Sequence, residues 1–402
     1  MSQTLSERKL KPIIKSFVCI VVSALALTGC SNKINKTGAW LVSSDSTLVP
    51  AYFDSIKDSA KVTSSQINVG LPTGSSASLV LGMVPWTESD LLLRFSALDP
   101  VDSAQQILST TITLYRDSYI LQPSGTDVNN LQFAGFSMDT IWNSTTFTWD
   151  SVTAAGYGSQ NIITSSTITD STVVLQIDST IVRQWAIATA DTNVSNNGFI
   201  IRPQNSQGML AVYGPAYATT GYVPVCTVTY IKGGVLDTTS VSLSYATAVA
   251  RTSIATLAPQ GPYRFVQAGT GERENLVFDL TRVPRYSIVN QATLTVTTDS
   301  AGQLNYAKNL ANDTLVAYYV SDPTTGLFST SYPAVGYPAA GSKNVFDVTA
   351  LVQHMINAQN YGFIILQYSE LDNIDTRFVY NENAPDSLKP KLTITYTPTS
   401  RR

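Results

Sequence analysis

Cysteine, histidine and charged residues are all scarce in this 402-residue sequence. It contains three cysteines and one histidine, and charged residues make up 13% of it. Cys19 and Cys30 lie in the N-terminal segment, so Cys226 stands alone in the body of the chain and has no partner for an internal disulfide. A lone thiol within a strand pattern is expected to be buried and inert. Packing of the core must therefore stabilise the fold, and the chain is long enough for that.

The single histidine, His354, excludes several kinds of site. A transition-metal site is not expected without a second His or Cys nearby. No Gly-x-Ser-x-Gly elbow accompanies His354, so the sequence predicts no Ser-His-Asp triad. A phosphate-binding glycine loop and a dinucleotide motif are also missing from the sequence. The net charge of −3, with no basic run in the body of the chain, argues against a nucleic-acid partner.

Residues 1–30 are typical of a targeting segment. Basic residues near the start precede the apolar run 17–27, which is shorter than the roughly 20 residues of a membrane-spanning helix. The run ends in Leu-Thr-Gly-Cys, which resembles the lipobox of bacterial lipoproteins and implies lipidation of Cys30. The chain is then held at a membrane of the cell envelope. Ser31 is similar to the sorting signals of diderm bacteria that favour the outer membrane.

Most of the remaining sequence has the pattern of β-strands. Apolar and polar residues alternate at 111–115, 227–230, 293–296 and 392–396. Period-two alternation indicates half-buried antiparallel strands, and Val, Thr and Tyr favour pleated surfaces. Frequent turns interrupt these runs. The sequence thus predicts an all-β protein of jelly-roll-like antiparallel β-sandwiches.

A long internal repeat divides this β-rich region. Gly-Phe-Ile-Ile occurs at 198–201 and 362–365, and Pro-x-x-Thr-(Val/Ile)-Thr-Tyr occurs at 224–230 and 390–396. The copies lie about 165 residues apart, far beyond the roughly 20–50 residues of a solenoid repeat. We therefore expect two tandem domains. The predicted boundaries are 1–30 for the signal peptide, 31–44 for a linker, 45–232 for module one, 233–237 for a linker and 238–398 for module two.

Each module is expected to carry one short helix, beginning just after Asp178 or Asp347. Asp-x-Thr before an apolar, helix-periodic stretch favours capping of the free N–H groups at the helix start. A catalytic role for these two carboxylates is the alternative. Trp185 and His354 fall at equivalent helix positions. Trp185 is expected to pack the helix on the sheet and His354 to lie at the surface.

The order of these motifs resembles that of the DNRLRE (disaggregatase-related) domain, also classed as carbohydrate-binding module family ninety-six. Residues 142–150 are similar to the family's Trp-x-Glu-x-x-x-Thr-Trp-Asn segment, with Ser144 in place of Glu and Asp150 in place of Asn. Module two lacks both tryptophans. The resemblance spans nearly all of 45–398. It implies jelly-roll sandwiches on a non-catalytic surface protein that binds polysaccharide.

Candidate carbohydrate contacts are aromatic residues beside carboxylates. We single out Trp86, Glu88 and Asp90, together with Trp142 and Trp149. Trp86 follows Pro85 in a predicted loop. Trp142 and Trp149 are an odd number of residues apart, so on an unbroken strand one would face the core and the other the outside. Burial in the core is the alternative for each ring.

Acidic pairs leave two further possibilities open. A glycosidase needs two carboxylates about 5–10 Å apart across a cleft, but the acidic pairs here fall in turn-like stretches. Asp372-Asn373-Ile374-Asp375 offers oxygen ligands for calcium, without the spaced ladder of a calcium loop. No other cofactor and no metal site are expected.

Three functions follow from these observations. The first is a non-catalytic, lipid-anchored envelope protein whose partner is a polysaccharide. The second is a structural or adhesive envelope protein whose partners are other proteins. The third is an enzyme acting on polysaccharide, which the single histidine and the scarcity of charge disfavour.

Overall fold

The computed structural model describes residues 49–95, 106–190, 196–217, 221–252, 261–299 and 314–399. Residues 1–48, which include Cys30 and the predicted signal peptide, lie outside the described residues. Both predicted modules fall within one unit, Pro50–Pro398. The predicted fold class is confirmed, because the chain is mostly β and forms two antiparallel sheets, each curled around a core of its own. None of the helices in the described ranges is long and apolar enough to cross a bilayer.

The first sandwich has eleven strands, in the order β12-β11-β5-β10-β3-β4-β9-β6, with β13 on β4, β8 on β5 and β7 on β8. Its strands are β3 (Ser78–Val84), β4 (Thr87–Arg94), β5 (Gln106–Leu121), β6 (Phe133–Ser137), β7 (Ile163–Ile168), β8 (Thr172–Ile177), β9 (Phe199–Pro203), β10 (Gly208–Tyr213), β11 (Val225–Lys232), β12 (Val235–Ser242) and β13 (Tyr245–Thr252).

The second sandwich also has eleven strands, in the order β1-β22-β16-β19-β18-β17-β20-β15-β14-β21, with β2 on β15. Its strands are β1 (Ala51–Asp54), β2 (Val62–Asn68), β14 (Tyr263–Gln267), β15 (Glu272–Phe278), β16 (Ile288–Thr297), β17 (Leu315–Asp322), β18 (Leu327–Ala339), β19 (Lys343–Asp347), β20 (Phe363–Gln367), β21 (Thr376–Tyr380) and β22 (Lys391–Thr397).

One long strand in each sandwich belongs to both halves of its curled sheet. The first part of β5 pairs with β11 and β8, whereas its last residues pair with β10 after a register shift. In the second sandwich β18 pairs first with β17 and then with β19. Side chains on the inner faces of the two halves fill the core, as alternation in these strands requires.

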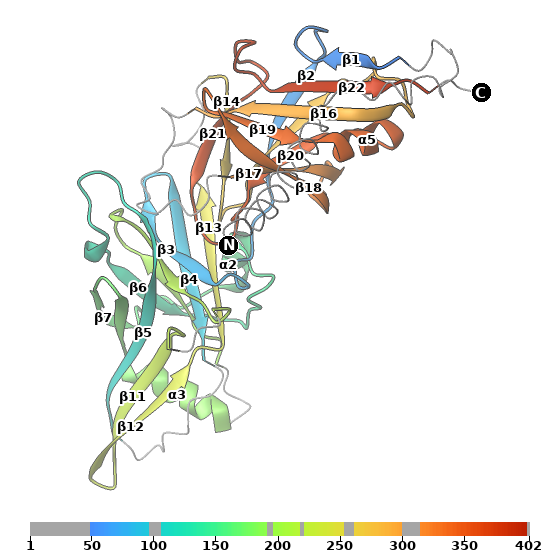
Figure 1. Ribbon diagram of the computed structural model, residues 1–402. Coiled ribbons are helices and arrows are strands. Elements are labelled where there is room, and N and C mark those ends of the chain that lie inside the picture. Colours follow the sequence, from blue (N-terminus) through green and yellow to red (C-terminus); the bar gives the residue numbers. More distant parts are fainter. Residues whose placement is uncertain are drawn as a thin grey trace, which may run out of the picture. The chain divides into compact units, whose positions relative to one another are not determined.

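The N-terminal strands complete the sandwich at the other end of the chain. β1 pairs with β22, and β2 pairs with β15, so residues 51–68 belong to the second sandwich although the repeat placed them in module one. Conversely, β13 pairs with β4 of the first sandwich. Figure 1 shows blue β1 beside red β22.

Residues 233–237, predicted as a linker, form the turn and first strand residues of a hairpin. Gly233 and Gly234 have φ of 57° and 82°, and β12 pairs with β11 along its whole length. Two successive positive φ angles match the twist of a two-residue hairpin turn, so the chain turns back here and adds a strand. The predicted module boundaries describe the repeat in the sequence. Strand pairing divides the chain differently, because β1 and β2 pair in the second sandwich and β13 pairs in the first.

Within the described ranges, four short helices connect these strands. They are η2 (Val128–Asn130), α2 (Trp149–Ala155), α3 (Ser179–Ala190) and α5 (Thr349–Asn357). α3 and α5 are the two helices predicted from the repeat, and α2 was not predicted. The Asp178 carboxylate accepts a hydrogen bond from the Thr180 N–H at 2.8 Å, and Asp347 accepts one from the Thr349 N–H at 3.1 Å. Both aspartates therefore bond to the free N–H groups at the helix start, as expected.

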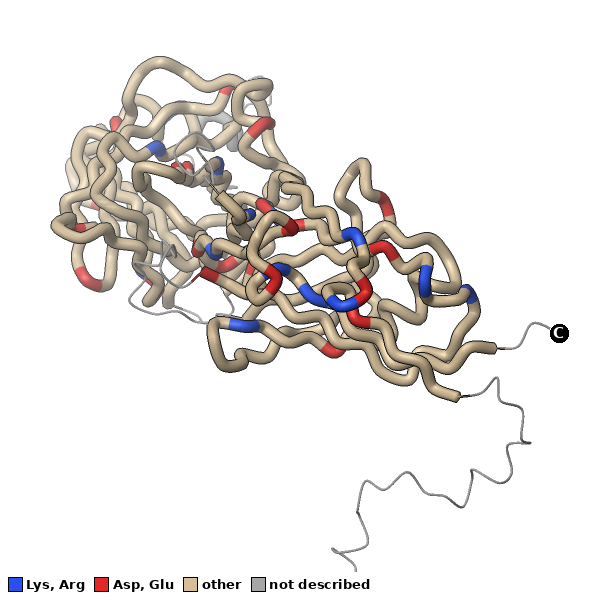
Figure 2. Tube along the Cα trace, turned by 90° about the horizontal axis from the view of Figure 1, so that it is seen from above, with Lys and Arg blue, Asp and Glu red and all other residues tan. Residues whose placement is uncertain are grey.

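Other expectations about single residues are also met. Trp185 is buried and stacks on Phe199 with ring centroids 5.4 Å apart, so it joins α3 to the sheet. His354 is exposed on α5, where its ring contacts Tyr319 edge-on. Cys226 is a free, buried cysteine, and burial raises the pKa of its thiol to about 12. The few charged residues carry both signs and are sparse along the trace (Figure 2).

The repeated Asn-x-Gly-Phe motif fixes the entry into equivalent strands. The Asn196 side chain donates to the Phe95 carbonyl at 2.8 Å, and Asn360 donates to the Phe278 carbonyl at 2.7 Å. The glycine that follows has φ of 75° at Gly198 and 91° at Gly362. A Cβ on either glycine would lie 2.3 Å from a carbonyl oxygen of the neighbouring strand. The motif is thus required by backbone geometry.

We expect Gly362→Ala to lower the free energy of unfolding by clearly more than the about 1–2 kcal/mol of a left-handed alanine, because its Cβ also meets the Leu276 oxygen. The control is Gly341→Ala, at φ 74° with nothing within 4 Å of its Cβ, which should cost only the conformational penalty. Urea unfolding curves measure both. Equal losses would contradict the proposed role of the motif.

Candidate functional site

Trp86 lies in the tight β3–β4 turn but points inward. It is 7% exposed and packs in a cluster with Tyr119, Phe265 and Ile374. Phe265 and Ile374 belong to the second sandwich, so Trp86 contributes to packing between strands of both sheets. Its ring offers no open face to a ligand.

Trp142 is also buried, at 4% exposure, and its ring N–H donates to the Asn197 carbonyl at 2.8 Å. The segment 142–149 is not the strand that the spacing assumed. The Asn143 carboxamide oxygen accepts from the Thr145 N–H at 2.9 Å and so forms a turn, and a capping box of Thr148 and Ser151 then starts α2. Local side-chain bonds of this kind compete with strand formation.

The segment 138–157 covers the outer face of β4, β9 and β13. Met138, Trp142 and Val152 form a separate small core with Leu92 and Ile200. Even-numbered residues of β4 point to this side, because successive side chains of a strand alternate. This arrangement brings Glu88, Asp90 and the half-buried Trp149 to one surface. Trp86, which the sequence analysis placed beside the two carboxylates, lies on the other side.

Two arginines join these three predicted residues. Arg202 on β9 reaches Glu88 at 2.9 Å and Asp90 at 2.8 Å. Arg251 on β13 reaches Glu88 at 2.6 Å and lies over the Trp149 ring, 4.5 Å from its centroid. Both carboxylates therefore accept from guanidinium groups, and a cation covers one face of Trp149. A groove of about 380 Å³ opens beside Glu88 and Arg251.

Asp90 is fully buried at the inner end of this network. Burial raises the pKa of its carboxyl to about 7, although the nearby Arg202 opposes the shift. The Arg202 guanidinium, for its part, also donates to the Tyr157 hydroxyl at 2.6 Å. Because the buried Asp90 carboxyl accepts a hydrogen bond from Arg202, it fixes the orientation of the Arg202 guanidinium. The network positions Arg202 and Arg251 against the covering segment.

An exposed aromatic surface lies elsewhere on the first sandwich, on tyrosines that the sequence reasoning did not select. Tyr213, at the end of β10, stacks on Tyr217 with centroids 4.1 Å apart and planes 19° apart. Tyr222 lies 5.4 Å from Tyr213 and 5.8 Å from Tyr115 on β5. We call Tyr115, Tyr213, Tyr217 and Tyr222 the tyrosine cluster.

Strand pairing brings the tyrosine cluster together. Val212 of β10 pairs with Arg116 of β5, and Val225 at the start of β11 pairs with Thr113 of β5. Tyr115 lies on the outward face of β5 together with Asp117. Tyr222 is 46% exposed, and the other three rings are half-buried. Partial burial and the negative charge of Asp117 raise the pKa of Tyr213.

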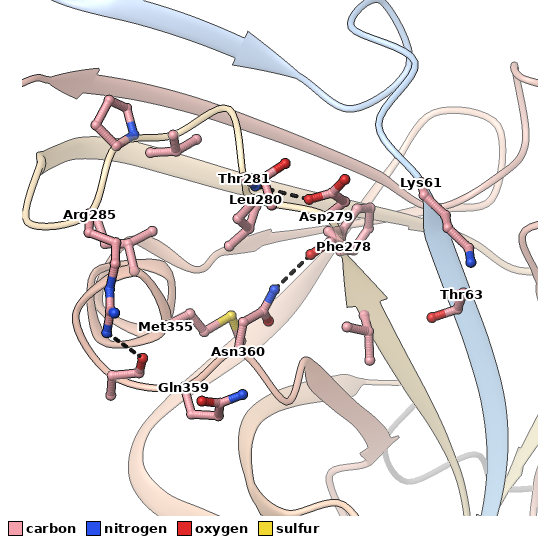
Figure 3. Close-up of a pocket in the computed structure, with 15 residues that line it drawn as sticks. Lys61, Thr63, Phe278, Asp279, Leu280, Thr281, Arg285, Met355, Gln359 and Asn360 are labelled. Carbon is pink, nitrogen blue, oxygen red and sulfur yellow. Dashed lines mark hydrogen bonds between the residues drawn. The ribbon is translucent and has the colours of Figure 1, made fainter.

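A groove of about 630 Å³, lined by both polar and apolar residues, opens on the second sandwich (Figure 3). Lys61, just before β2, and Thr63 of β2 form one wall, and the end of β15 with the turn after it and the end of α5 with the residues after it form the others. The Asp279 carboxylate accepts from the Thr281 N–H at 2.9 Å, and this bond lowers its pKa. Asn360 donates to the Phe278 carbonyl. The groove presents amides and both signs of charge, whereas its aromatic residue, Phe278, is buried.

The segment 372–375, for which calcium was left open as a possibility, is held by protein contacts. Asp372 accepts from the Ser76 hydroxyl at 2.6 Å, and Asp375 accepts from the Tyr119 hydroxyl at 2.8 Å. The Asn373 oxygen accepts from the Asp375 N–H. Among the residues that the structure describes, no three His, Cys, Asp or Glu side chains gather as metal ligands would.

Replacing Asp90 should change how stability depends on pH. A carboxyl with a pKa raised from 3.8 to about 7 binds its proton more tightly in the folded state, so its contribution is lost as pH rises through that range. We expect the free energy of unfolding of the wild type to fall, relative to that of Asp90→Asn, from about pH 4 to about pH 7.

Thermal or urea unfolding across this pH range measures the difference. Asp150→Asn, at the exposed start of α2, is the control for removing a carboxylate outside the buried network. Parallel curves for Asp90→Asn and the wild type would contradict the shift.

No protein-family model matches the chain, and no curated protein matches it. Among solved structures it is similar to the C-terminal domain of the Streptococcus agalactiae AgI/II polypeptide BspA, at 9% identity over 85% of this chain and 92% of that chain, with a TM-score of 0.13. A structure named BspA_C_mut is 11% identical over 80% of this chain and 90% of its own, with the same TM-score of 0.13. Similarity this low carries no argument about fold or function.

Proposed function

We propose that this chain is a non-catalytic lipoprotein of the cell envelope that binds polysaccharide through the tyrosine cluster. The supporting observation is four tyrosine rings within stacking distance on an open face of the first sandwich, beside Asp117. Aromatic faces pack against the C–H face of a pyranose, and nearby hydroxyl and carboxylate groups bond to sugar hydroxyls. The lipid on Cys30 would hold this surface at the membrane, in a diderm bacterium at the outer membrane.

Rigid rings suit this task. Tyr213 and Tyr217 already stack on each other and Tyr222 packs against both, so little side-chain freedom is lost when a sugar binds. The resemblance to carbohydrate-binding modules points in the same direction, although of the two rings in its motif Trp142 is buried and Trp149 is half-buried under Arg251.

The alternative is an adhesive envelope protein that contacts other proteins. The observation in its favour is the tip of the β11–β12 hairpin, where Val235 and Leu236 are 68% and 65% exposed. Among the strands that the structure describes, β12 pairs with β11 and ends the order of the sheet, and such an edge strand can pair with another chain. An apolar tip on an open edge fits a protein partner better than a sugar.

The double variant Tyr213→Ala/Tyr217→Ala should lose polysaccharide binding by about tenfold or more, which corresponds to about 1.4 kcal/mol. Affinity electrophoresis of residues 31–402 against a panel of polysaccharides measures this, with folding checked by circular dichroism. Tyr337→Ala, an exposed ring on β18, is the control and should bind as the wild type does.

Two other results would redirect the proposal. Loss of binding in Gln359→Ala with the tyrosine variant unaffected would assign the sugar to the groove of the second sandwich. If no polysaccharide is retained, the proposal fails, and capture of envelope proteins that depends on Val235 and Leu236 would support the adhesive alternative.

A further inference from the structure

The two sandwiches are completed by equivalent strands at equivalent edges. The repeat makes β11 equivalent to β22, and β4 equivalent to β15. β12 covers the edge of β11 as β1 covers that of β22. β13 runs the full length of β4 as β2 runs the full length of β15. The strand pairs β12–β13 and β1–β2 therefore occupy the same structural position.

The two pairs reach that position by different routes. β12 follows β11 through the Gly233-Gly234 turn, so the first sandwich takes its last two strands from the chain that directly follows it. The second sandwich takes them from residues 51–68, which precede β3 of the first sandwich. The Leu392 N–H donates to the Ser55 hydroxyl at 3.0 Å across 337 positions. We call residues 51–68 the donor segment, and the edges of β22 and β15 the acceptor edges.

The donor segment contributes to the core of the second sandwich. Phe53 is 2% exposed and lies in the same cluster as Leu392 and Ile394. Burying a side chain of this size stabilises the sandwich that receives it. The buried Asp54 carboxylate lies 2.9 Å from the Lys391 ammonium, and hydrogen bonds from Lys391 and two backbone N–H groups lower its pKa against the effect of burial.

The donor segment also satisfies a buried carboxyl. Glu272 on β15 is buried, and its two oxygens accept from Asn68 at 2.6 Å and from Gln66 at 3.0 Å. Both partners are residues of β2. Without the donor segment Glu272 would lose these partners, and an unsatisfied buried carboxyl is costly. The acceptor edges thus require a strand pair of this composition to be complete.

We propose that the acceptor edges also take the donor segment of a second copy of this chain, so that copies join by strand exchange. All contacts described above lie within the donor segment and the acceptor edges. They are the same whether residues 69–77 lead to β3 of the same chain or of another. The donor segment can thus pair with the acceptor edges of its own chain or with those of a second copy, and the two cases differ mainly in effective concentration. Dilute protein favours pairing within one chain, and concentrated protein favours pairing between copies.

Residues 69–77, which we call the connector, are held against the first sandwich and include a turn at Thr73–Ser76. Thr73 exchanges hydrogen bonds with the Ala248 carbonyl and N–H at 2.8 and 2.9 Å. A Cβ on the neighbouring Gly74 would lie 2.1 Å from the Ser144 carbonyl oxygen, so no side chain fits at this position. These contacts bind the connector to the first sandwich of the chain that owns it. The donor segment therefore extends from a fixed point on the first sandwich, and it is the part of the chain that would change partners in the exchange.

Cysteine pairs at the β1–β22 contact test this proposal. Tyr52 is directly opposite Thr395. The mature chain without Cys30 has one other thiol, Cys226, which is buried. Tyr52→Cys and Thr395→Cys chains, made separately and differing in mass by a tag, are unfolded together in urea, refolded over a range of concentrations and oxidised. We expect a disulfide-linked species with one chain of each kind, increasing with concentration.

The control mixture pairs Tyr52→Cys with Tyr337→Cys, an exposed position on β18, and should give about tenfold less linked dimer. The double variant Tyr52→Cys/Thr395→Cys should close within one chain when dilute. If it does so while the mixture yields no more dimer than the control at any concentration, exchange between copies is overturned. Failure of the double variant to close would overturn the acceptor edge itself. The result is independent of polysaccharide binding.

Discussion

Pairing of residues 51–68 with β22 and β15 is the interaction on which the second sandwich depends. A β-sheet that buries one face still leaves two edges of unpaired N–H and carbonyl groups. In the first sandwich the adjoining hairpin strand β12 and strand β13 cover these edges. In the second sandwich the same task falls to strands that come from the other end of the sequence. Phe53, and the bonds of Gln66 and Asn68 to Glu272, make this pairing part of the core.

The motifs that repeat most clearly serve this architecture. Asn196 and Asn360 tie the chain to a neighbouring carbonyl, and the glycine two positions later allows a backbone approach that a Cβ would block. Asp178 and Asp347 bond to the starts of the two equivalent helices. Local backbone geometry therefore explains why the two asparagines and the two aspartates recur. We therefore sought function where the two sandwiches differ, and the tyrosine cluster lies on the first.

Several large aromatic residues lie in cores. Trp86, Trp142 and Trp185 are buried, where their large apolar area is worth most, while Trp149 is half-buried under Arg251. Four tyrosines form the tyrosine cluster at the surface where β5, β10 and β11 meet, whereas Tyr119 is buried beside Trp86. The proposed polysaccharide-binding role rests on this cluster. The same sandwich carries an open, apolar hairpin tip that would serve a protein partner.

The sequence by itself determined the fold class, the two-fold repeat, the bonding of both aspartates at the helix starts and the burial of Cys226 and Trp185. Each of these depends on local periodicity or on residues a few positions apart. The tertiary structure decided the rest. The alternation of residues along a strand predicts that a sheet has edges but not which strand covers each edge. The pairing of β1 with β22 and of β2 with β15 was therefore not predictable. Side-chain bonds at Asn143 and Thr148 replaced the expected strand by a turn and α2. The tyrosine cluster depends on contacts between residues about 100 positions apart, which only the pairing of β5, β10 and β11 brings together.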